Sequence, residues 1–226
     1  GTTDRDHAGG PPSASAEEIA YLCEGASRYF RKAVTPADVV WTYSGVRPLI
    51  DDGSGKPEAA TRGYRLDLSE EGEGAALLAV FGGKITTYRH LAEEAVDLLC
   101  ERLGCASDRH WTATAPLPGG DFPMEGVARL ASELAARHRF LDPAQAARMA
   151  HAYGTRAFAM LGEAQTLADC GIDFGHGLTE REVRYLMAHE WAVTAEDVLW
   201  RRSKLGLRFS AAETAALKAW MEEQAG

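Results

Sequence analysis

The amino-acid sequence predicts an α+β fold, in which a partial sheet with helices is followed by an all-α C-terminal helical domain. Three observations favour this class. The apolar run Leu77 to Phe81 is typical of a buried strand, and the alternating segment Tyr64 to Leu68 is typical of a half-buried strand. Beyond residue 123, strand patterns are missing and helix-capping sequences recur.

The elements of the first part follow from local patterns. A capping box at Ser15 predicts a helix that runs to about Lys32. Residues 35–38 (TPAD) predict a short helical turn that has proline at its first position. Residues 39–49 (VVWTYSGVRPL) predict a strand that is interrupted at its glycine and stopped at its proline.

The most informative stretch is residues 77–89 (LLAVFGGKITTYR). Its apolar run predicts a strand that is covered on both faces. Gly82 and Gly83 allow a tight turn and the close approach of a ligand. We expect Thr86 and Thr87 to cap a helix whose N–H groups face that ligand. A strand–Gly-Gly–helix turn of this kind is a site for an anion or an electron-rich ring.

The helix after this turn is expected to carry one apolar stripe. Leu91, Ala95, Leu98 and Leu99 fall on the same face at helical spacing, and Gly104 is expected to end the helix.

The proline- and glycine-rich residues 114–123 (TAPLPGGDFP) indicate a domain boundary. We therefore divide the chain into residues 1–115, a linker at 116–123 and a helical domain at 124–226. In that domain the predicted helix caps are Asp142-Pro143-x-Gln145, Thr179-x-x-Glu182, Thr194-x-x-Asp197 and Ser210-x-x-Glu213. We expect Trp191 and Trp200 to be core residues of the domain, and His176, between two glycines, to shape a turn.

Composition narrows the class of protein. The chain has 226 residues, of which 46% are hydrophobic and 25% charged, and a net charge of −9 argues against general nucleic-acid binding. The four cysteines are scattered, which fits a reduced, cytoplasmic compartment, and we interpret Cys100 and Cys105 as ordinary half-buried residues. The sequence contains no G-x-G-x-x-G and no Walker loop, and it opens without methionine, so we expect a piece of a longer protein.

Arg47 is the first candidate for a binding or catalytic residue. It follows Gly45 and is held by Pro48 at the end of an expected strand. A guanidinium fixed in this way offers a rigid fork of donors to a carboxylate, a phosphate or a developing alkoxide. It could equally pair with Asp51 or Asp52, and both interpretations stay open.

Arg62 and Lys84 are the other cationic candidates. Arg62 precedes the alternating strand, and its alternative is a solvated surface charge, the commoner environment of an arginine. Lys84 lies within the glycine turn, which faces whatever binds at the start of the helix. No residue is assigned as a metal ligand.

Taken together, VVWTYSGVRPL, the arginine of TRGY and VFGGKITTYRHLAEEAVDLL resemble the FAD-dependent glycerol-3-phosphate dehydrogenases, the aerobic, quinone-linked enzymes and their oxidase relatives. WTATAPLPGGDF resembles the link to the C-terminal domain of this family. YGTRAFAML and DFGHGLTEREVRYLMAHEWAVTAEDVLWRRSKLGL resemble that domain. The resemblance covers essentially the whole chain and implies the C-terminal part of such an enzyme, with residues 1–115 an incomplete part of its FAD- and substrate-binding domain.

The resemblance also implies a reaction, namely hydride transfer from C2 of sn-glycerol 3-phosphate to FAD, giving dihydroxyacetone phosphate, with electrons passing to a membrane quinone. Arg47 would be catalytic, stabilising the alkoxide that develops at C2, and Arg62 would hold the substrate phosphate. Lys84 would place positive charge near flavin or phosphate. The implied cofactor-binding residues are Gly45, Arg47, Gly82, Gly83, Lys84, Thr86 and Thr87. The general base is not identified.

Further expectations concern the setting of the enzyme. The family implies a cytoplasmic protein associated peripherally with the inner face of the cell membrane, whose partners are glycerol 3-phosphate, quinone and the membrane surface, and which could form a homodimer. An oxidase using oxygen is an alternative. Another is that the isolated chain acts as a non-catalytic helical docking or dimerisation module. We expect the isolated chain to be inactive and to bind FAD negligibly.

Overall fold

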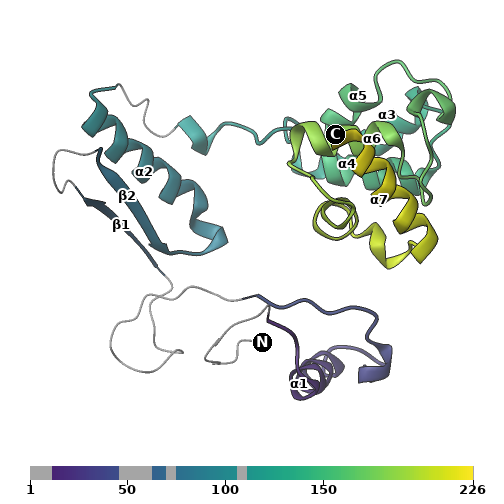
Figure 1. Ribbon diagram of the computed structural model, residues 1–226, viewed down its shortest axis with the longest axis horizontal. Helices are drawn as coiled ribbons and strands as arrows, with labels where there is room; N and C mark the ends of the chain where they lie inside the picture. Colours follow the sequence, from purple (N-terminus) through teal and green to yellow (C-terminus); the bar gives the residue numbers. More distant parts are fainter. Residues whose placement is uncertain (1–11, 46–62, 70–74, 106–110, 226) are drawn as a thin grey trace. The chain divides into compact units, whose positions relative to one another are not determined.

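The computed structural model of the chain describes residues 12–45, 63–69, 75–105 and 111–225. It divides into two compact units, residues 1–115 and 116–226. Within the described residues, the first unit holds a two-stranded sheet together with helices, and the second is helical (Figure 1). The predicted α+β class with a helical C-terminal domain is confirmed, whereas the exact linker bounds of 116–123 stay a prediction.

Helix α1, Ala16–Ser27, opens with the predicted capping box. It does not run on to Lys32 as expected. The hydroxyl of Ser27 donates to the carbonyl of Cys23 (2.8 Å) and accepts the amide of Val34 (2.9 Å), which folds the chain back on the helix end. The predicted end was therefore wrong, because a side-chain hydrogen bond stops the helix one turn early.

The short 3₁₀ turn η1, Pro36–Asp38, is confirmed with proline at its start. The strand expected over residues 39–49 is wrong for residues 39–45, which are extended but unpaired in the part of the chain that is described. Val40 and Tyr43 are 86% and 81% exposed there, so no neighbouring strand or helix covers them. Residues 46–49 lie outside the described residues.

A hairpin of two antiparallel strands forms the sheet. Strand β1, Tyr64–Ser69, pairs with β2, Leu77–Gly82, so that Tyr64 lies opposite Gly82. The burial of β1 alternates as predicted. The expectation that β2 is covered on both faces was wrong for the described residues, where the sheet has only two strands and Leu77 and Val80 stay exposed.

Helix α2, Tyr88–Leu103, follows the 3₁₀ turn η2, Ile85–Thr87, and contacts β1. It ends at Gly104, as predicted, with φ 66° in the left-handed region. Three residues of its predicted apolar stripe are half-buried, while Leu99 is exposed.

The second unit is a bundle of helices around one apolar core. The most completely buried side chains include Leu134, Val183, Leu186 and Leu217. Its helices are α3 (Val127–Arg137), α4 (Pro143–Tyr153), α5 (Arg156–Leu161), α6 (Glu180–His189) and α7 (Ala211–Ala225). Short turns are η4 (Met124–Gly126), η5 (Leu167–Cys170), η7 (Leu205–Leu207) and the π-helical η6 (Asp197–Arg202); η3 (Trp111–Ala113) lies in the first unit.

Three of the four predicted helix caps are confirmed by their hydrogen bonds, those that begin at Asp142, Thr194 and Ser210. The fourth is right in its position only. Thr179 occupies the cap position, but its buried hydroxyl has no hydrogen-bond partner, and Glu182 turns into the core instead of back to the cap.

The two tryptophans differ in burial. Trp200 is half-buried against the core, as expected. Trp191 is 84% exposed, so its placement in the core was wrong. It adopts a positive φ of 55° in the bend after α6, and this turns its ring outward while the next residue, Ala192, is buried. His176 also has a positive φ, 52°, consistent with its expected place in a turn.

The segment before α3 is fixed to the helical unit. The carbonyl of Gly119 accepts the amide of Thr155 at 3.0 Å, and the Thr155 hydroxyl donates to Asp121. Gly154 packs so closely that a Cβ on it would lie 1.9 Å from the Gly119 oxygen. Part of the predicted linker is therefore a packed element.

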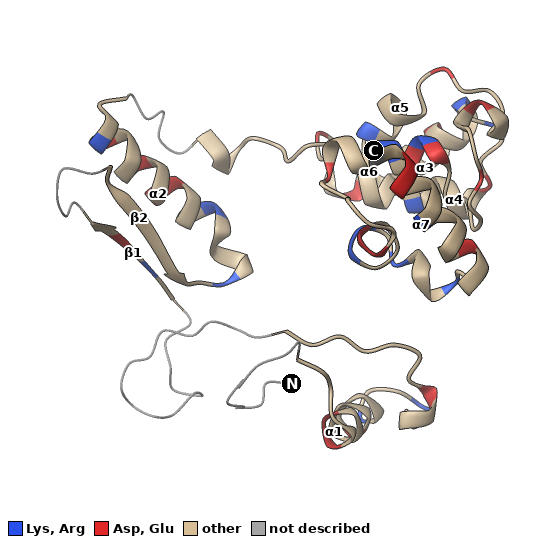
Figure 2. Ribbon diagram, in the orientation of Figure 1, with Lys and Arg blue, Asp and Glu red and all other residues tan. Residues whose placement is uncertain are grey.

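Charge is spread over the helices in both signs (Figure 2). Much of it forms pairs one helical turn apart, such as Arg89–Glu93 at 3.1 Å and Arg184–Glu180 at 2.8 Å. Within the described ranges, none of the helices combines the length and the apolar character needed to cross a membrane.

Candidate functional site

The candidate site is the turn that joins β2 to α2. Gly82 and Gly83 have φ values of 70° and 100°, a region that residues with a side chain rarely adopt. A Cβ on Gly83 would lie 3.4 Å from Cδ1 of Leu91 and 3.6 Å from Cβ of Tyr64. The backbone of the turn therefore lies directly against both α2 and β1.

Two amides of this turn donate within the chain. The amide of Gly83 donates to the carbonyl of Gly63 at 2.9 Å, and the amide of Thr87 donates to the carbonyl of Lys84 at 3.0 Å. The hydroxyl of Thr87 donates to the same carbonyl at 3.0 Å. Thr87 occupies the N-cap position of α2, yet its side chain makes no capping bond, so the expected threonine cap is wrong.

The amides of Ile85 and Thr86, which lie between those of Gly83 and Thr87 in the sequence, have a different environment. Ile85 and Thr86 open the helical segment, and the first N–H groups of a helix have no acceptor within it. Both residues are exposed. The turn can thus offer two adjacent backbone donors at the positive end of a helix, the usual arrangement for binding an anion or a carbonyl edge.

The structure brings five of the predicted site residues together in this turn: Gly82, Gly83, Lys84, Thr86 and Thr87. Gly45 lies in the exposed segment after η1, with no atom within 4 Å of the position of a Cβ. Arg47 and Arg62 lie outside the described residues. Gly63, the residue after Arg62 in the sequence, is the one held by the Gly83 amide.

Three side-chain contacts that the sequence did not predict support the turn. The hydroxyl of Tyr64 donates to Glu94 at 2.7 Å, which ties β1 to α2 and raises the pKa of Tyr64. Arg89 binds Glu93 at 3.1 Å and Thr112 at 3.4 Å, which joins η3 to α2. The spacing of Arg89 and Glu93 could have indicated that pair; the contacts to Tyr64 and Thr112 have no sequence pattern.

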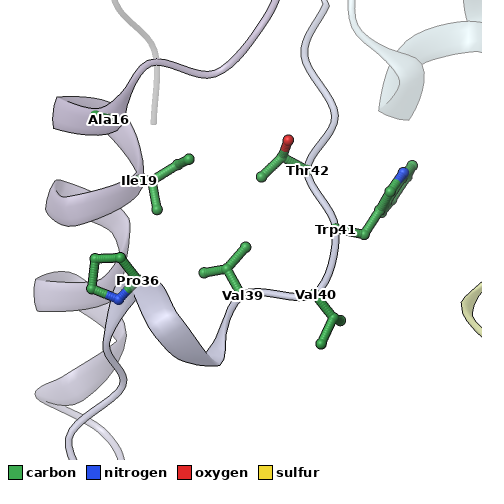
Figure 3. A pocket seen from close by; sticks show the side chains of 7 residues that line it. All are labelled: Ala16, Ile19, Pro36, Val39, Val40, Trp41 and Thr42. Carbon is green, nitrogen blue, oxygen red and sulfur yellow. The ribbon is translucent and has the colours of Figure 1, made fainter.

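A separate pocket of about 420 Å³ lies beside α1. In Figure 3, Ile19 faces Val39 and Thr42 across it. Its lining residues are Ala16, Ile19, Pro36, Val39, Val40, Trp41 and Thr42. These residues carry no charge, so the pocket suits an apolar group and supplies no catalytic chemistry.

The most buried charges of the described chain lie in the helical unit. Arg148 of α4 holds Glu182 of α6 through two contacts, at 2.6 and 2.8 Å, and the hydroxyl of Tyr153 donates to the same carboxylate at 2.6 Å. Burial raises the pKa of Tyr153, and the Glu182 charge raises it further. The cluster is enclosed by the core, so its role is to join helices. Glu182 falls on the same helix face as Leu186, a pattern that could have indicated its burial.

Among the described residues, no group of three or more histidine, cysteine, aspartate or glutamate side chains is arranged to hold a metal ion.

Comparison with known proteins gives a consistent result. The family model described as the C-terminal domain of alpha-glycerophosphate oxidase matches residues 110–225. A glycerol-3-phosphate dehydrogenase of Pseudomonas aeruginosa is 46% identical over 99% of this chain, and the aerobic glycerol-3-phosphate dehydrogenase of Escherichia coli is 43% identical over 99%. A D-erythritol 1-phosphate dehydrogenase of Brucella abortus is 42% identical over 98%. The chain spans 44% of the length of each of these three relatives.

Proposed function

Because this chain belongs to the alpha-glycerophosphate oxidase and glycerol-3-phosphate dehydrogenase family, we propose that it supplies part of the active site of a flavoenzyme that oxidises sn-glycerol 3-phosphate to dihydroxyacetone phosphate. The observation that carries the proposal is the identity of 46% to a glycerol-3-phosphate dehydrogenase over nearly the whole chain. The proposal includes FAD as hydride acceptor, quinone as electron acceptor, and a cytoplasmic enzyme on the inner face of the membrane.

The residues of the glycine turn fit a flavin. The ring of FAD, when bound, supplies a two-electron acceptor for the hydride that leaves C2 of the substrate. An isoalloxazine needs donors at its carbonyl edge, and the positive φ values of Gly82 and Gly83 let the backbone turn so that the start of the helix can offer them. We assign the donors to the amides of Ile85 and Thr86, since those of Gly83 and Thr87 already donate within the chain. The positive helix end there favours negative charge by about 0.3–2 kcal/mol.

The cations have distinct roles in the proposal. Arg62 binds the substrate phosphate through charge-assisted hydrogen bonds. It is supported by the contact between the amide of Gly83 and the carbonyl of Gly63, because that contact holds the residue next to Arg62 at the glycine turn. Arg47 stabilises the oxygen at C2 as the hydride leaves, and Lys84 adds positive charge beside the ring or the phosphate.

The two arginines should differ in their kinetic effects. In the full-length enzyme, we expect Arg62→Ala to raise KM for glycerol 3-phosphate roughly 10- to 100-fold, and Arg47→Ala to lower kcat by a similar factor, because each loses a hydrogen bond to a charged group of about 1.5–3 kcal/mol. Arg65→Ala is the matched control, since Arg65 is an exposed arginine of β1 that stacks on Phe81. Unchanged steady-state constants in both test variants would refute the assignment.

Substrate and electron acceptor are tested by assay of the full-length enzyme. We expect faster turnover with a quinone analogue than with oxygen, and with glycerol 3-phosphate than with D-erythritol 1-phosphate. Rapid reoxidation of the reduced enzyme by air would identify an oxidase instead. Preference for the four-carbon substrate would assign the activity named for the Brucella relative.

The isolated chain should behave differently. The helical unit has its own core, whereas in the described part of the first unit the strand residues Leu77 and Val80 are exposed. This contrast favours the second candidate function for the chain alone, a helical docking module without catalysis. We expect negligible FAD binding in equilibrium dialysis and no dehydrogenase activity. A stoichiometric yellow complex would contradict this expectation.

A further inference from the structure

Two cysteines meet where α2 ends. The amide of Cys105 donates to the carbonyl of Cys100 at 3.0 Å, and Gly104 between them has φ 66° and ψ 26°. This is the 6→1 hydrogen bond of a Schellman motif, in which the first and last side chains contact each other. The turn that ends the helix therefore places one thiol against the other.

Both thiols are free, and they hydrogen-bond to each other. Cys105 is exposed and Cys100 half-buried, whereas Cys23 and Cys170 are both buried. The contact raises the pKa of the Cys100 thiol. An oxidant in solution therefore meets Cys105 first, with Cys100 in place as the second thiol.

The backbone geometry suits a covalent link. A hydrogen bond of 3.0 Å between the amide of Cys105 and the carbonyl of Cys100 limits their Cα atoms to a separation below about 7 Å. Disulfides usually join Cα atoms about 4.4–6.8 Å apart. We propose that Cys100 and Cys105 form a redox-sensitive dithiol, which a low-molecular-weight disulfide such as glutathione disulfide converts into a disulfide across the end of α2.

The proposed thiol–disulfide exchange needs no reactant other than glutathione disulfide. The Cys105 thiolate attacks one sulfur of glutathione disulfide, the S–S bond breaks, and one glutathione thiolate leaves. The Cys100 thiol loses its proton and attacks the Cys105 sulfur, releasing the second glutathione. Two protein thiols are oxidised to a disulfide, and one glutathione disulfide is reduced to two glutathiones. Because the attacking group is the Cys100 thiolate, the second step accelerates as the pH rises.

The test uses the whole chain, reduced and then treated with glutathione disulfide. After maleimide quenching and tryptic digestion, mass spectrometry should show peptides that end at Arg102 and begin at Leu103 joined through Cys100 and Cys105. The same chain unfolded in urea should close this pair about tenfold more slowly, because it lacks the preformed contact.

Three variants make the result specific. Cys100→Ser should stop at a stable glutathione adduct on Cys105, and Cys105→Ser should give at most a glutathione adduct on Cys100, with no disulfide within the chain. Cys23→Ser should close the pair as the parent chain does. The proposal fails if a glutathione adduct accumulates on Cys105 in the parent chain without closure, or if the folded and unfolded chains close at equal rates.

Discussion

Replacing Glu182 with glutamine is expected to lower the free energy of unfolding of the helical unit by about 3–5 kcal/mol, because the change leaves a buried guanidinium without its counter-charge. The Glu182 side chain is fully buried and that of Arg148 is 21% exposed, so water replaces little of the lost interaction. The Tyr153 hydroxyl keeps an acceptor in the amide oxygen of glutamine, whereas Arg148 loses its counter-charge and one of its two acceptor oxygens.

The matched control is Glu180→Gln on the same helix. Glu180 pairs with Arg184 at 2.8 Å, where the Arg184 side chain is 54% exposed, and it also accepts the amide of Ile172 at 3.2 Å. This change should therefore cost about 1 kcal/mol. Urea unfolding, followed by the fluorescence of Trp200 and Trp220, measures the free energy of unfolding of both variants. Equal losses in the two variants would show that the pair to Arg148 contributes no more than a surface pair.

A second comparison separates charge from packing. Replacing the whole cluster by apolar residues, Arg148→Met with Tyr153→Phe and Glu182→Leu, should restore most of the lost stability, since no buried charge is then left unpaired. If the triple variant is as unstable as Glu182→Gln, the cluster acts through its shape rather than its charges.

Glu182 also shows a limit of prediction from sequence. A serine or threonine followed three residues later by a glutamate is a helix-cap pattern, and it succeeded at Ser210, where neither partner is buried. At Thr179 it failed, because Arg148 comes from another helix and offers Glu182 stronger hydrogen bonds than a backbone amide does. Local patterns predict local partners, and the competing partner lay 34 residues away.

The two strands and the glycine turn were predicted for the opposite reason. Alternation in β1, the apolar run of β2 and the two glycines are all properties of neighbouring residues, so the sequence carries them directly. The sequence did not reveal that Gly83 donates to Gly63, because that contact depends on the register of two strands. The exposure of β2 was missed for a related reason. An apolar run predicts that a strand is buried, but it does not identify the segment that covers the strand.

Gly154→Ala is the second change with a large expected effect, a loss of about 2–6 kcal/mol in the free energy of unfolding of the helical unit. Gly154 has φ 55° and ψ −136°, a conformation that costs a residue with a side chain about 1–3 kcal/mol. Its Cβ would also lie 1.9 Å from the carbonyl oxygen of Gly119, which is backbone and cannot turn aside as a flexible side chain does. Overpacking of this kind adds about 1–3 kcal/mol.

Comparison with Gly162→Ala isolates the second contribution, the overpacking. Gly162 has nearly the same conformation, φ 56° and ψ −126°, but the nearest atom to its Cβ would be a guanidinium nitrogen of Arg181 at 3.4 Å. This variant should show only the conformational cost of about 1–3 kcal/mol. Thermal unfolding, followed by circular dichroism, should therefore give a lower melting temperature for Gly154→Ala than for Gly162→Ala. Equal melting temperatures would mean that residues 119–121 move away freely, and that the segment before α3 is not held by its contact with the α4–α5 turn.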